Sequence, residues 1–449
     1  MNCIKDRMSC EMARDNDVNA IAITGMGAIC PLNHVVYECI EDIWKRLLYG
    51  ESGIKKLNFQ LSGHEQYCQI AGQITLDFEQ YLTQYEARYY DRFIQFGLLA
   101  AKQALIDAGI VSEDNEGSIK VMMNKDQLQR VGVSVGSGIG GLNFLTQGME
   151  KIRNNARISP FCIPGCLINL CAGAISIKYG FTGPCQSIVT ACATGAHSII
   201  DGCRILKEGL ADYMVVGGSE AISELSFAGF AAMQTLAKDY NDKPEEASRP
   251  YDKNRCGFVM SEGAAVLVLE RLEHALQRGA KVYAVIQGYG MTADAKHITN
   301  PDPDGSRRSM QQALYMAGIA AKDIAYINTH ATSTIIGDKS ELIALKELLG
   351  VDVGKPVISA IKASTGHLLG ASGALSAIFT VMALSEQVAP PTRNLSNPDE
   401  EAYYRDAAGN MQLMNISAKQ QVFSGDYAIM NTLGFGGNNA SIIFKRYSN

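Results

Sequence analysis

The sequence predicts a layered α/β fold made of two similar halves, and three observations support this prediction. Apolar, β-branched segments typical of strands alternate with helical segments over almost the whole chain. Segments 21–27 and 284–290 each consist of an apolar strand that runs into a Gly-X-Gly turn, which indicates an internal duplication. Hydrophobic residues make up 47% of the 449 residues, enough to fill the core of a protein of this size.

The first half begins with a short apolar strand at 20–24. Helical periodicity follows at 38–49 and 91–108, and a β-branched segment leads into a further helix at 193–207. The stretch 163–179 predicts a buried helix because both of its faces are apolar or small. The remaining strands of this half are expected at 131–135, 186–190, 213–217 and 264–270.

The second half repeats the alternation. Its strands are expected at 283–287, 324–328, 357–360, 427–431 and 440–444, and its helices at 306–317, 338–348 and 370–384. The last helix is rich in Ala, Ser and Gly and contains the longest apolar run, about 11 residues near 374–384. A membrane-spanning helix needs roughly 18 such residues, so the run predicts a buried helix and no membrane span.

Composition excludes several classes of protein. Lys and Arg total 40 against 46 Asp and Glu, a net charge of -6, which argues against a general nucleic-acid-binding protein. The 12 cysteines form no CxxC pair and have no histidine at zinc spacing, so we expect reduced thiols, a cytoplasmic protein and no metal site. Residues 1–19 are polar, lack the apolar stretch of a signal peptide and are expected to form a flexible extension.

The two Gly-X-Gly turns do not predict a dinucleotide site. Neither completes GxGxxG at the start of a helix, and no acidic residue follows a second strand about 20 residues later. The phosphate-binding pattern GxxxxGK[ST] and the zinc pattern HExxH do not occur in the sequence either. We therefore interpret both segments as tight turns between strands and helices.

Cys192 is the candidate nucleophile. It follows a β-branched strand and stands among small residues, near the first turn of the next helix. Unpaired N–H groups and the positive end of the helix dipole favour an anion at such a place, which predicts a stabilised thiolate. The small neighbours Ala191, Ala193 and Gly195 leave space for an incoming acyl group.

Two of the seven histidines are candidate partners of this thiol. His330 and His367 each follow a strand of the second half and are flanked by Gly, Ala, Ser or Thr, so the imidazoles can be approached closely. A nucleophilic cysteine requires such groups nearby. The loop 434–437 is a further candidate: its backbone N–H groups can form an oxyanion hole, and its glycines allow the bulky Phe435 to swing.

These motifs together resemble one family of enzymes. The chain contains TACATG at 190–195, NTHATST at 328–334, KASTGHLLG at 362–370 and GFGG at 434–437. In this order they resemble the β-ketoacyl-acyl carrier protein synthases, the condensing enzymes of the thiolase superfamily. The resemblance covers about 20–444, and the segments 288–294, 366–370 and 394–399 are most similar to the elongating synthase II type.

The resemblance implies a duplicated, five-layered αβαβα thiolase-like fold, with a first half at 20–278 and a second half at 279–449. The implied reaction is the decarboxylative Claisen condensation of a malonyl thioester with an acyl-enzyme in fatty acid chain elongation. Acyl carrier protein is the implied partner, and its phosphopantetheine arm brings both substrates. No other cofactor is expected, and the implied assembly is a homodimer.

The roles of individual residues follow from the matched motifs. Cys192 takes the acyl chain, and its N–H forms the oxyanion hole with that of Phe435. His330 and His367 donate hydrogen bonds to the malonyl thioester carbonyl. Lys362 fixes the site electrostatically.

Further residues are implied around this centre. Glu341 is expected to act together with Lys362 in fixing the site electrostatically, and Asp338 lies on the same helical face as Glu341. Arg88, Arg157 and Lys238 are expected to dock the acidic carrier protein near the pocket mouth. In the implied homodimer, 187–190 pairs with its copy in the other subunit, which protects an uncharged β-branched edge.

Several positions depart from the family pattern. Ala331 stands where Gly is usual, Cys256 where Asp is usual and Ser261 where Gly is common. Leu433 replaces Phe and Asn438 replaces Thr around the final loop. None of these changes removes a catalytic group, but the last two predict a changed gate or acyl pocket.

Three alternatives compete with this interpretation. A ketosynthase of a type II polyketide or aryl-polyene pathway shares every catalytic residue, so the sequence leaves it open. An inactive chain-length-factor-like subunit is disfavoured because such subunits lack the nucleophile. A degradative thiolase is excluded because it uses a second cysteine near its C-terminal base, and no cysteine follows Cys256.

Overall fold

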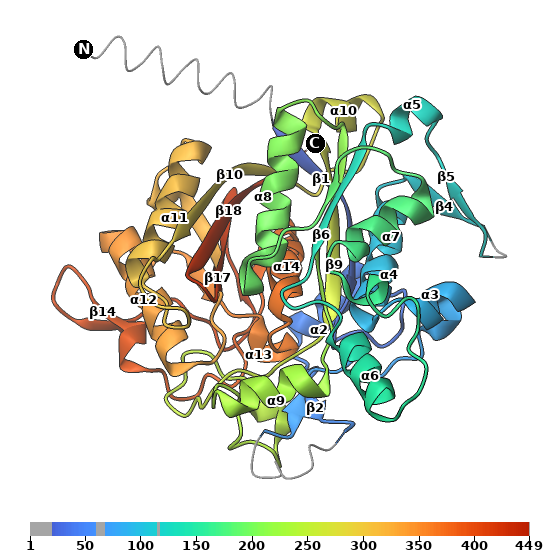
Figure 1. The fold of residues 1–449 in the computed structure, drawn as a ribbon. Helices are drawn as coiled ribbons and strands as arrows, with labels where there is room; N and C mark the ends of the chain where they lie inside the picture. Colours follow the sequence, from blue (N-terminus) through green and yellow to red (C-terminus); the bar gives the residue numbers. More distant parts are fainter. Residues whose placement is uncertain (1–19, 60–67, 115–116, 449) are drawn as a thin grey trace.

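In the computed structural model, residues 20–59, 68–114 and 117–448 are described. The extension predicted at 1–19 lies outside these residues. A ten-stranded sheet, in the order β12-β11-β17-β18-β10-β1-β9-β8-β6-β7, forms the framework of the molecule. Helices cover the sheet on both sides and also fill the space between its two halves (Figure 1).

The strands of the large sheet fall into two sets of five. The first set is β1 (Ile21–Ile29), β6 (Val131–Gly136), β7 (Cys185–Gln186), β8 (Tyr213–Glu220) and β9 (Gly263–Arg271). The second set is β10 (Ala284–Ala293), β11 (Ile324–Asn328), β12 (Val357–Ser359), β17 (Tyr427–Gly434) and β18 (Asn438–Arg446). From edge to centre the orders are β7-β6-β8-β9-β1 and β12-β11-β17-β18-β10, so the same five-strand topology occurs twice.

The main helices are α2 (Ile40–Leu48), α3 (Gln84–Tyr89), α4 (Arg92–Asp107), α6 (Leu142–Arg153), α7 (Leu170–Tyr179), α8 (Thr194–Lys207), α9 (Glu224–Ala232), α11 (Pro303–Ala317), α12 (Ile335–Leu349) and α14 (Ser372–Glu386). Short helices are α5 (Lys125–Leu128), α10 (Leu272–Gln277) and α13 (Lys362–Thr365). Small two-stranded pairs at the surface are β2 (Lys55–Lys56) with β3 (Ile70–Ala71), β4 (Val111–Glu113) with β5 (Ile119–Val121), β13 (Val388–Ala389) with β16 (Gln421–Val422), and β14 (Tyr403–Arg405) with β15 (Met411–Leu413).

The layers follow from strands that are apolar on both faces. In β9, Leu267 and Leu269 belong to the core around α8 and α14, whereas Val266 and Val268 belong to the core under α4 and α7. Successive side chains of a strand point to opposite faces, so one uninterrupted apolar run serves two layers of helices. With α11 and α12 covering the other half, the result is the predicted αβαβα arrangement.

The central helices α8 and α14 touch through glycines at their first turns. A Cβ on Gly195 would lie 2.7 Å from the backbone N of Ala374, and one on Gly373 would lie 2.6 Å from that of Ala196. Only glycine permits backbones to approach this closely. The contact brings together the turns that precede the two helices. Cys192 lies in the turn before α8, and His367 lies two residues before the turn that leads into α14.

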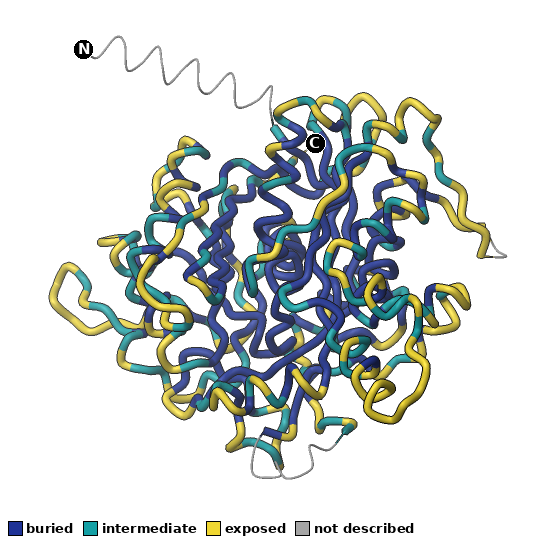
Figure 2. Tube along the Cα trace, in the orientation of Figure 1, coloured by how far each residue is buried: buried dark blue, intermediate teal, exposed yellow. Residues whose placement is uncertain are grey.

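Helix α14 confirms the predicted buried apolar helix. Among the described residues, the stretch Leu369–Glu386 is the one helix long and apolar enough to cross a membrane, and 89% of it is buried inside the protein. It lies in the dark blue centre of the molecule in Figure 2. Packing on all sides explains why it is apolar all round.

The two Gly-X-Gly segments are strands rather than the predicted turns. Gly25 and Gly27 lie inside β1, and Gly288 and Gly290 lie inside β10. A Cβ on any of these glycines would lie within 2.4 Å of a backbone carbonyl oxygen of α4 or α11, so the glycines allow each strand to pack closely against a helix.

Two further predicted elements differ from the structure. The helix expected at 163–179 begins only at Leu170, because Pro164 and Gly165 form a separate 3-10 turn before it. The strand expected at 186–190 ends at Gln186 in the single chain. It lies at the edge of the sheet, where β7 has a neighbour on one side only, and the Ser187 hydroxyl donates to the Val135 carbonyl at 2.7 Å.

Candidate active site

Cys192 lies at a sharp turn immediately before a central helix, as the sequence predicts. It is the middle residue of the 3-10 turn η3 (Ala191–Ala193), and α8 begins directly after this turn, at Thr194. Ala191 has a φ of +49°, which is unusual for a residue with a side chain. Thr190 N donates to Thr194 Oγ1 at 2.9 Å and so helps hold the turn.

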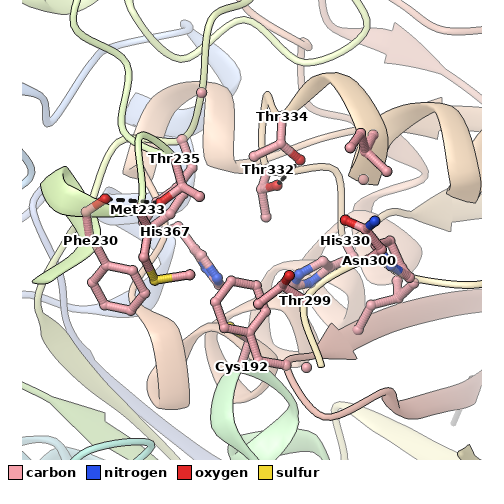
Figure 3. A pocket seen from close by; sticks show the side chains of 18 of the residues that line it. Cys192, Phe230, Met233, Thr235, Thr299, Asn300, His330, Thr332, Thr334 and His367 are labelled. Atoms are coloured by element: carbon pink, nitrogen blue, oxygen red, sulfur yellow. Dashed lines mark hydrogen bonds between the residues drawn. The ribbon is translucent and has the colours of Figure 1, made fainter. Parts of the chain in front are cut away.

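A cavity of about 420 Å³ opens over the Cys192 thiol. Figure 3 shows side chains from both halves of the chain surrounding it. Cys192, His330 and His367 all line it, together with the aromatic residues Phe230 and Phe258. The structure therefore brings together the three predicted groups, although Cys192 is more than 130 residues from either histidine in the sequence.

The two histidines stand side by side. Their ring centroids are 5.3 Å apart and their planes are nearly perpendicular, at 86°. The Nδ1 atom of His367 lies 2.8 Å from Ser372 Oγ, which leaves Nε2 as the ring nitrogen available to a ligand. Burial lowers the pKa of both imidazoles well below its usual value, and the positive charge of Lys362 acts in the same direction. Both rings are therefore neutral near pH 7, and each can donate one N–H to a substrate oxygen.

Glu341 holds the loop that carries His330. Its two carboxylate oxygens accept the backbone N–H groups of His330 and Ala331, each at 2.8 Å. Asp338, one turn earlier on α12, accepts the N–H groups of Ser333 at 3.0 Å and Tyr251 at 2.9 Å. Two carboxylates on one helical face thus fix the segment after β11. Asp338 also forms an ion pair with Arg255 at 3.5 Å, and Glu341 also accepts from Asn431 Nδ2 at 3.4 Å.

Lys362 is buried beside this clamp, with a side chain that is 2% exposed. The predicted electrostatic partnership with Glu341 does not take the form of a direct contact, because among the described residues no ion pair of 4.0 Å or less joins the two side chains. The carboxylate of Glu341 is already occupied by two N–H donors. The two charges still interact at longer range: burial lowers the pKa of Lys362, while Glu341 opposes that shift.

The thiol of Cys192 differs from its prediction. Burial raises its pKa to about 12, although Lys362 and the backbone N–H groups of Phe435 and Cys192 itself lower it. The predicted stabilisation of a resting thiolate is wrong, because the effect of burial on the pKa is larger than the opposing effects of Lys362 and the N–H groups. Cys192 rests as a protonated thiol.

Those two N–H groups occupy the place that the sequence assigns to an oxyanion hole. Both are close enough to the sulfur of Cys192 to stabilise negative charge on it. Phe435 lies in the hairpin between β17 and β18, where Gly436 and Gly437 have φ values of +87° and +74°. Its ring is 6.4 Å from that of Phe230, so Phe435 forms one side of the cavity.

The departures from the family pattern fall mainly on this wall. Leu433 and Cys256 line the cavity, and Asn438 Nδ2 donates to the Phe435 carbonyl at 3.1 Å. Ser261 N donates to the His367 carbonyl at 2.9 Å. Changes at these positions therefore lie next to the gate and to one of the histidines, while every predicted catalytic side chain remains.

The three cations predicted to dock a carrier protein are exposed but do not line the cavity. Arg88, on α3, stacks over the Tyr89 ring at 5.3 Å and lines a second, polar hollow. Arg157 lies after α6 and Lys238 after α9. Their role stays a prediction.

Sequence reasoning missed the aromatic wall and one buried acid. Phe230 and Phe258 are ordinary apolar residues in sequence, and only the fold turns them toward Cys192. Glu220 ends the apolar, Gly-rich strand β8 and is fully buried. An acidic residue at the end of such a strand was the available signal.

A buried thiol that shares a cavity with two neutral histidines and an N–H pair defines an acyl-transferring enzyme. Two family models match this chain: the β-ketoacyl synthase N-terminal domain over residues 18–275 and the C-terminal domain over 283–396. The chain therefore belongs to the β-ketoacyl synthase family and is a condensing acyltransferase.

Relatives of known name cover nearly the whole chain. The 3-oxoacyl-[acyl-carrier-protein] synthase 2 of Rhizobium meliloti is 43% identical over 443 residues, which is 95% of this chain and 99% of the relative. The protein of the same name from Vibrio cholerae is 42% identical over 434 residues, again 95% of this chain and 99% of the relative. A β-ketoacyl synthase structure from Burkholderia phymatum has a TM-score of 0.84 at 28% identity, and the match covers 96% of this chain and 100% of that one.

Proposed function

We propose that this chain is an elongating 3-oxoacyl-[acyl-carrier-protein] synthase that extends fatty acyl chains by two carbons. The observation that carries the proposal is the shared cavity, in which the Cys192 thiol faces two neutral imidazoles and two backbone N–H groups. The substrate class follows the relatives of more than 40% identity. Acyl carrier protein would deliver both substrates as thioesters, and no further cofactor takes part in the proposed route.

The first step is acyl transfer to Cys192. The sulfur attacks the thioester carbonyl of the acyl carrier, and the N–H groups of Cys192 and Phe435 hold the oxyanion that forms. The new C–S bond replaces the bond to the carrier, whose sulfur leaves with the thiol proton. One thiol replaces another, so the step releases no net proton, although the Cys192 sulfur must give up its proton as it attacks.

The second step uses the histidines. His330 and His367 donate N–H bonds to the thioester carbonyl of the malonyl group, so negative charge can gather on that oxygen as the C–C bond to the carboxylate breaks and CO2 leaves. The resulting carbanion attacks the acyl-Cys192 carbonyl. A C–C bond forms, the Cys192 sulfur leaves and takes up one proton, and a 3-oxoacyl thioester is released.

Mass spectrometry tests this assignment. The protein is incubated with acyl carrier proteins that bear chains of different length, and the acylated peptide is identified. We expect an acyl group on Cys192 and, after malonyl carrier protein is added, a product two carbons longer. Acylation at another residue, or no elongation by the intact protein, would contradict the proposal.

A polyketide-type ketosynthase is the second candidate. It is favoured by the likeness to an acyl-carrier protein complex of a type II polyketide ketosynthase, with a TM-score of 0.81 at 25% identity, and to the ishigamide ketosynthase and chain length factor, with a TM-score of 0.82 at 26% identity. Both identities are far below those of the fatty acid enzymes. Efficient extension of polyunsaturated or polyketo chains, with little activity on saturated ones, would favour this candidate.

We further propose that the protein works as a cytoplasmic homodimer. The edge segment 187–190 lies beside β7, and Val189 in it is 49% exposed. Exposed aliphatic side chains also occur on and after α6, at Leu145, Met149, Ile152, Ile158, Ile163 and Leu167. Such a surface favours a copy of the chain as its partner. Sedimentation at micromolar concentration should give a dimer, and an active monomer would contradict this.

Carrier docking is proposed at Arg88, Arg157 and Lys238. Carrier proteins of this class are acidic, and these exposed cations offer complementary charge. The Arg157→Glu variant should raise the KM for acyl carrier protein and weaken its salt dependence, with little change for a small thioester. An equal loss on both substrates would assign Arg157 to the fold instead.

A further inference from the structure

A carboxylate without a cationic partner is buried near the nucleophile. Glu220 is the last residue of β8, and its side chain is fully buried. Among the described residues, no Lys, Arg or His nitrogen pairs with it. Its four neighbours are donors, namely Ser137 Oγ at 2.6 Å, Gly138 N at 2.8 Å, Ile139 N at 3.3 Å and Gly370 N at 3.0 Å. Its negative charge reaches the active site, where it raises the pKa of Cys192.

The donors come from two loops that are distant in sequence. Gly138 lies in the loop after β6, and Gly370 is the middle residue of the 3-10 turn η7 (Leu369–Ala371) before α14. A Cβ on Gly370 would lie 2.4 Å from Gly138 N and 2.8 Å from Glu220 Oε2. The two backbones are thus in contact, and the single carboxylate joins them.

Both loops contribute to the surroundings of Cys192. Leu369 is in the apolar cluster that contains Cys192, and Ile139 packs against that cluster. Leu369 also has a φ of +45°, a conformation that persists in a leucine only when neighbouring contacts enforce it. The bond from Gly370 N to Glu220 is such a contact, one residue away.

The histidines are held by other groups. His367 N donates to the Val259 carbonyl at 2.8 Å, and its ring contacts Ser372. His330 is held by Glu341. The carboxylate of Glu220 therefore supports the nucleophile side of the cavity rather than the side where decarboxylation is proposed.

We propose that Glu220 is a positioning residue for acyl transfer: its carboxylate joins the loops 137–139 and 369–370 into a fixed wall against which the acyl chain on Cys192 is seated. The inference rests on the proposed condensing function. It assigns Glu220 to acyl transfer and not to decarboxylation, so replacing Glu220 should affect the two steps differently.

The test compares Glu220→Ala and Glu220→Gln with wild type in two assays, acylation of Cys192 by a long-chain acyl carrier protein and decarboxylation of malonyl carrier protein. Misplacing reacting groups by 1 Å can cost about 10²-fold in rate, and we expect a loss of about that size in acylation for Glu220→Ala. Decarboxylation should change by less than about threefold, because the histidines keep their own supports.

The conservative variant Glu220→Gln should restore part of the lost acylation rate. In Glu220→Gln the amide oxygen can still accept from Gly138 and Gly370, while the Ser137 hydroxyl can turn and accept from the new NH2 group. We expect acylation to fall by only about tenfold, roughly one lost hydrogen bond.

The matched control is Glu270→Gln. Glu270 is as deeply buried as Glu220. It lies on β9, the strand that pairs with β8, at the end farthest from Glu220. The Glu270 carboxylate forms an ion pair with Arg278. Its replacement should therefore lower the stability of the protein and change the acylation and decarboxylation rates by similar factors.

The outcomes are decisive in each case. Equal losses in both assays for Glu220→Ala, or for Glu220→Gln if the alanine variant does not fold, would overturn the inference. So would acylation at the wild-type rate in either variant. If the wild-type protein performs neither half-reaction, the proposed function fails instead, and the two failures are thereby distinguished.

Discussion

Cys192 and Gly370 occupy equivalent places in the two halves of the molecule. Each is the middle residue of a 3-10 turn that immediately precedes a central helix, α8 in one half and α14 in the other. Each turn begins with a non-glycine residue of positive φ, +49° at Ala191 and +45° at Leu369. The backbone conformation is the same, but the middle residue of one turn is the nucleophile, whereas the middle residue of the other is a glycine without a side chain.

The difference shows what this turn does. In the second half, the N–H of Gly370 donates to the buried carboxylate of Glu220. In the first half, the N–H of Cys192 lies beside its own sulfur, facing the cavity. The turn thus presents an N–H group that can donate to a negatively charged oxygen. In the second half the acceptor is the carboxylate of Glu220, and in the first half it would be the oxyanion of the substrate.

Replacing Cys192 in the turn of the first half should have the largest effect on activity. Cys192→Ala should abolish condensation, because it removes the thiol that lies beside the N–H groups of Cys192 and Phe435. The malonyl decarboxylation should survive, since His330 and His367 keep their contacts. Product analysis with acyl and malonyl carrier proteins measures both, and elongation near the wild-type rate in this variant would refute the assignment.

The histidine side should fail in the opposite sense. His330→Ala or His367→Ala should still allow acylation of Cys192 but slow decarboxylation by about 10²–10³-fold, the usual effect of removing one donor to a developing oxyanion. CO2 release and the mass of the acyl-enzyme report the two steps. Unchanged CO2 release in both variants would contradict the proposed role of the two imidazoles.

The pH dependence of the thiol sharpens the contrast further. Alkylation by iodoacetamide requires the thiolate, and burial raises the pKa of Cys192 to about 12. Its alkylation rate should therefore rise about tenfold per pH unit without a plateau between pH 7 and 10. Peptide mapping distinguishes Cys192 from the exposed Cys39, and a plateau near pH 7 would show that the thiol is activated after all.

The turn of the second half should resist even one methyl group. Gly370→Ala places a Cβ 2.4 Å from Gly138 N, and overpacking of this kind costs about 1–3 kcal/mol. Gly229→Ala on α9 is the control, because a Cβ there meets nothing within 4 Å, and it should be neutral or slightly stabilising. Chemical denaturation compares the two variants, and equal stabilities would argue against the close contact.

The sequence by itself determined the order of elements, the duplication and the candidate catalytic residues. Alternating apolar strands and helices are local patterns, and a cysteine or histidine among small residues at a strand end is visible without any structure. The apolar run near 374–384 likewise indicated its own burial, because no polar face interrupts it.

Only the tertiary structure decided the electrostatics and the supports of the site. The pKa of the Cys192 thiol depends on its burial, whose effect outweighs that of the N–H groups in the turn. Glu341 accepts hydrogen bonds from two backbone N–H groups of the loop after β11. Glu220 accepts one from the N–H of Gly370, which is 150 residues away in the sequence. Desolvation and long-range hydrogen bonds depend on how distant segments pack, so local residue patterns carry no direct record of them.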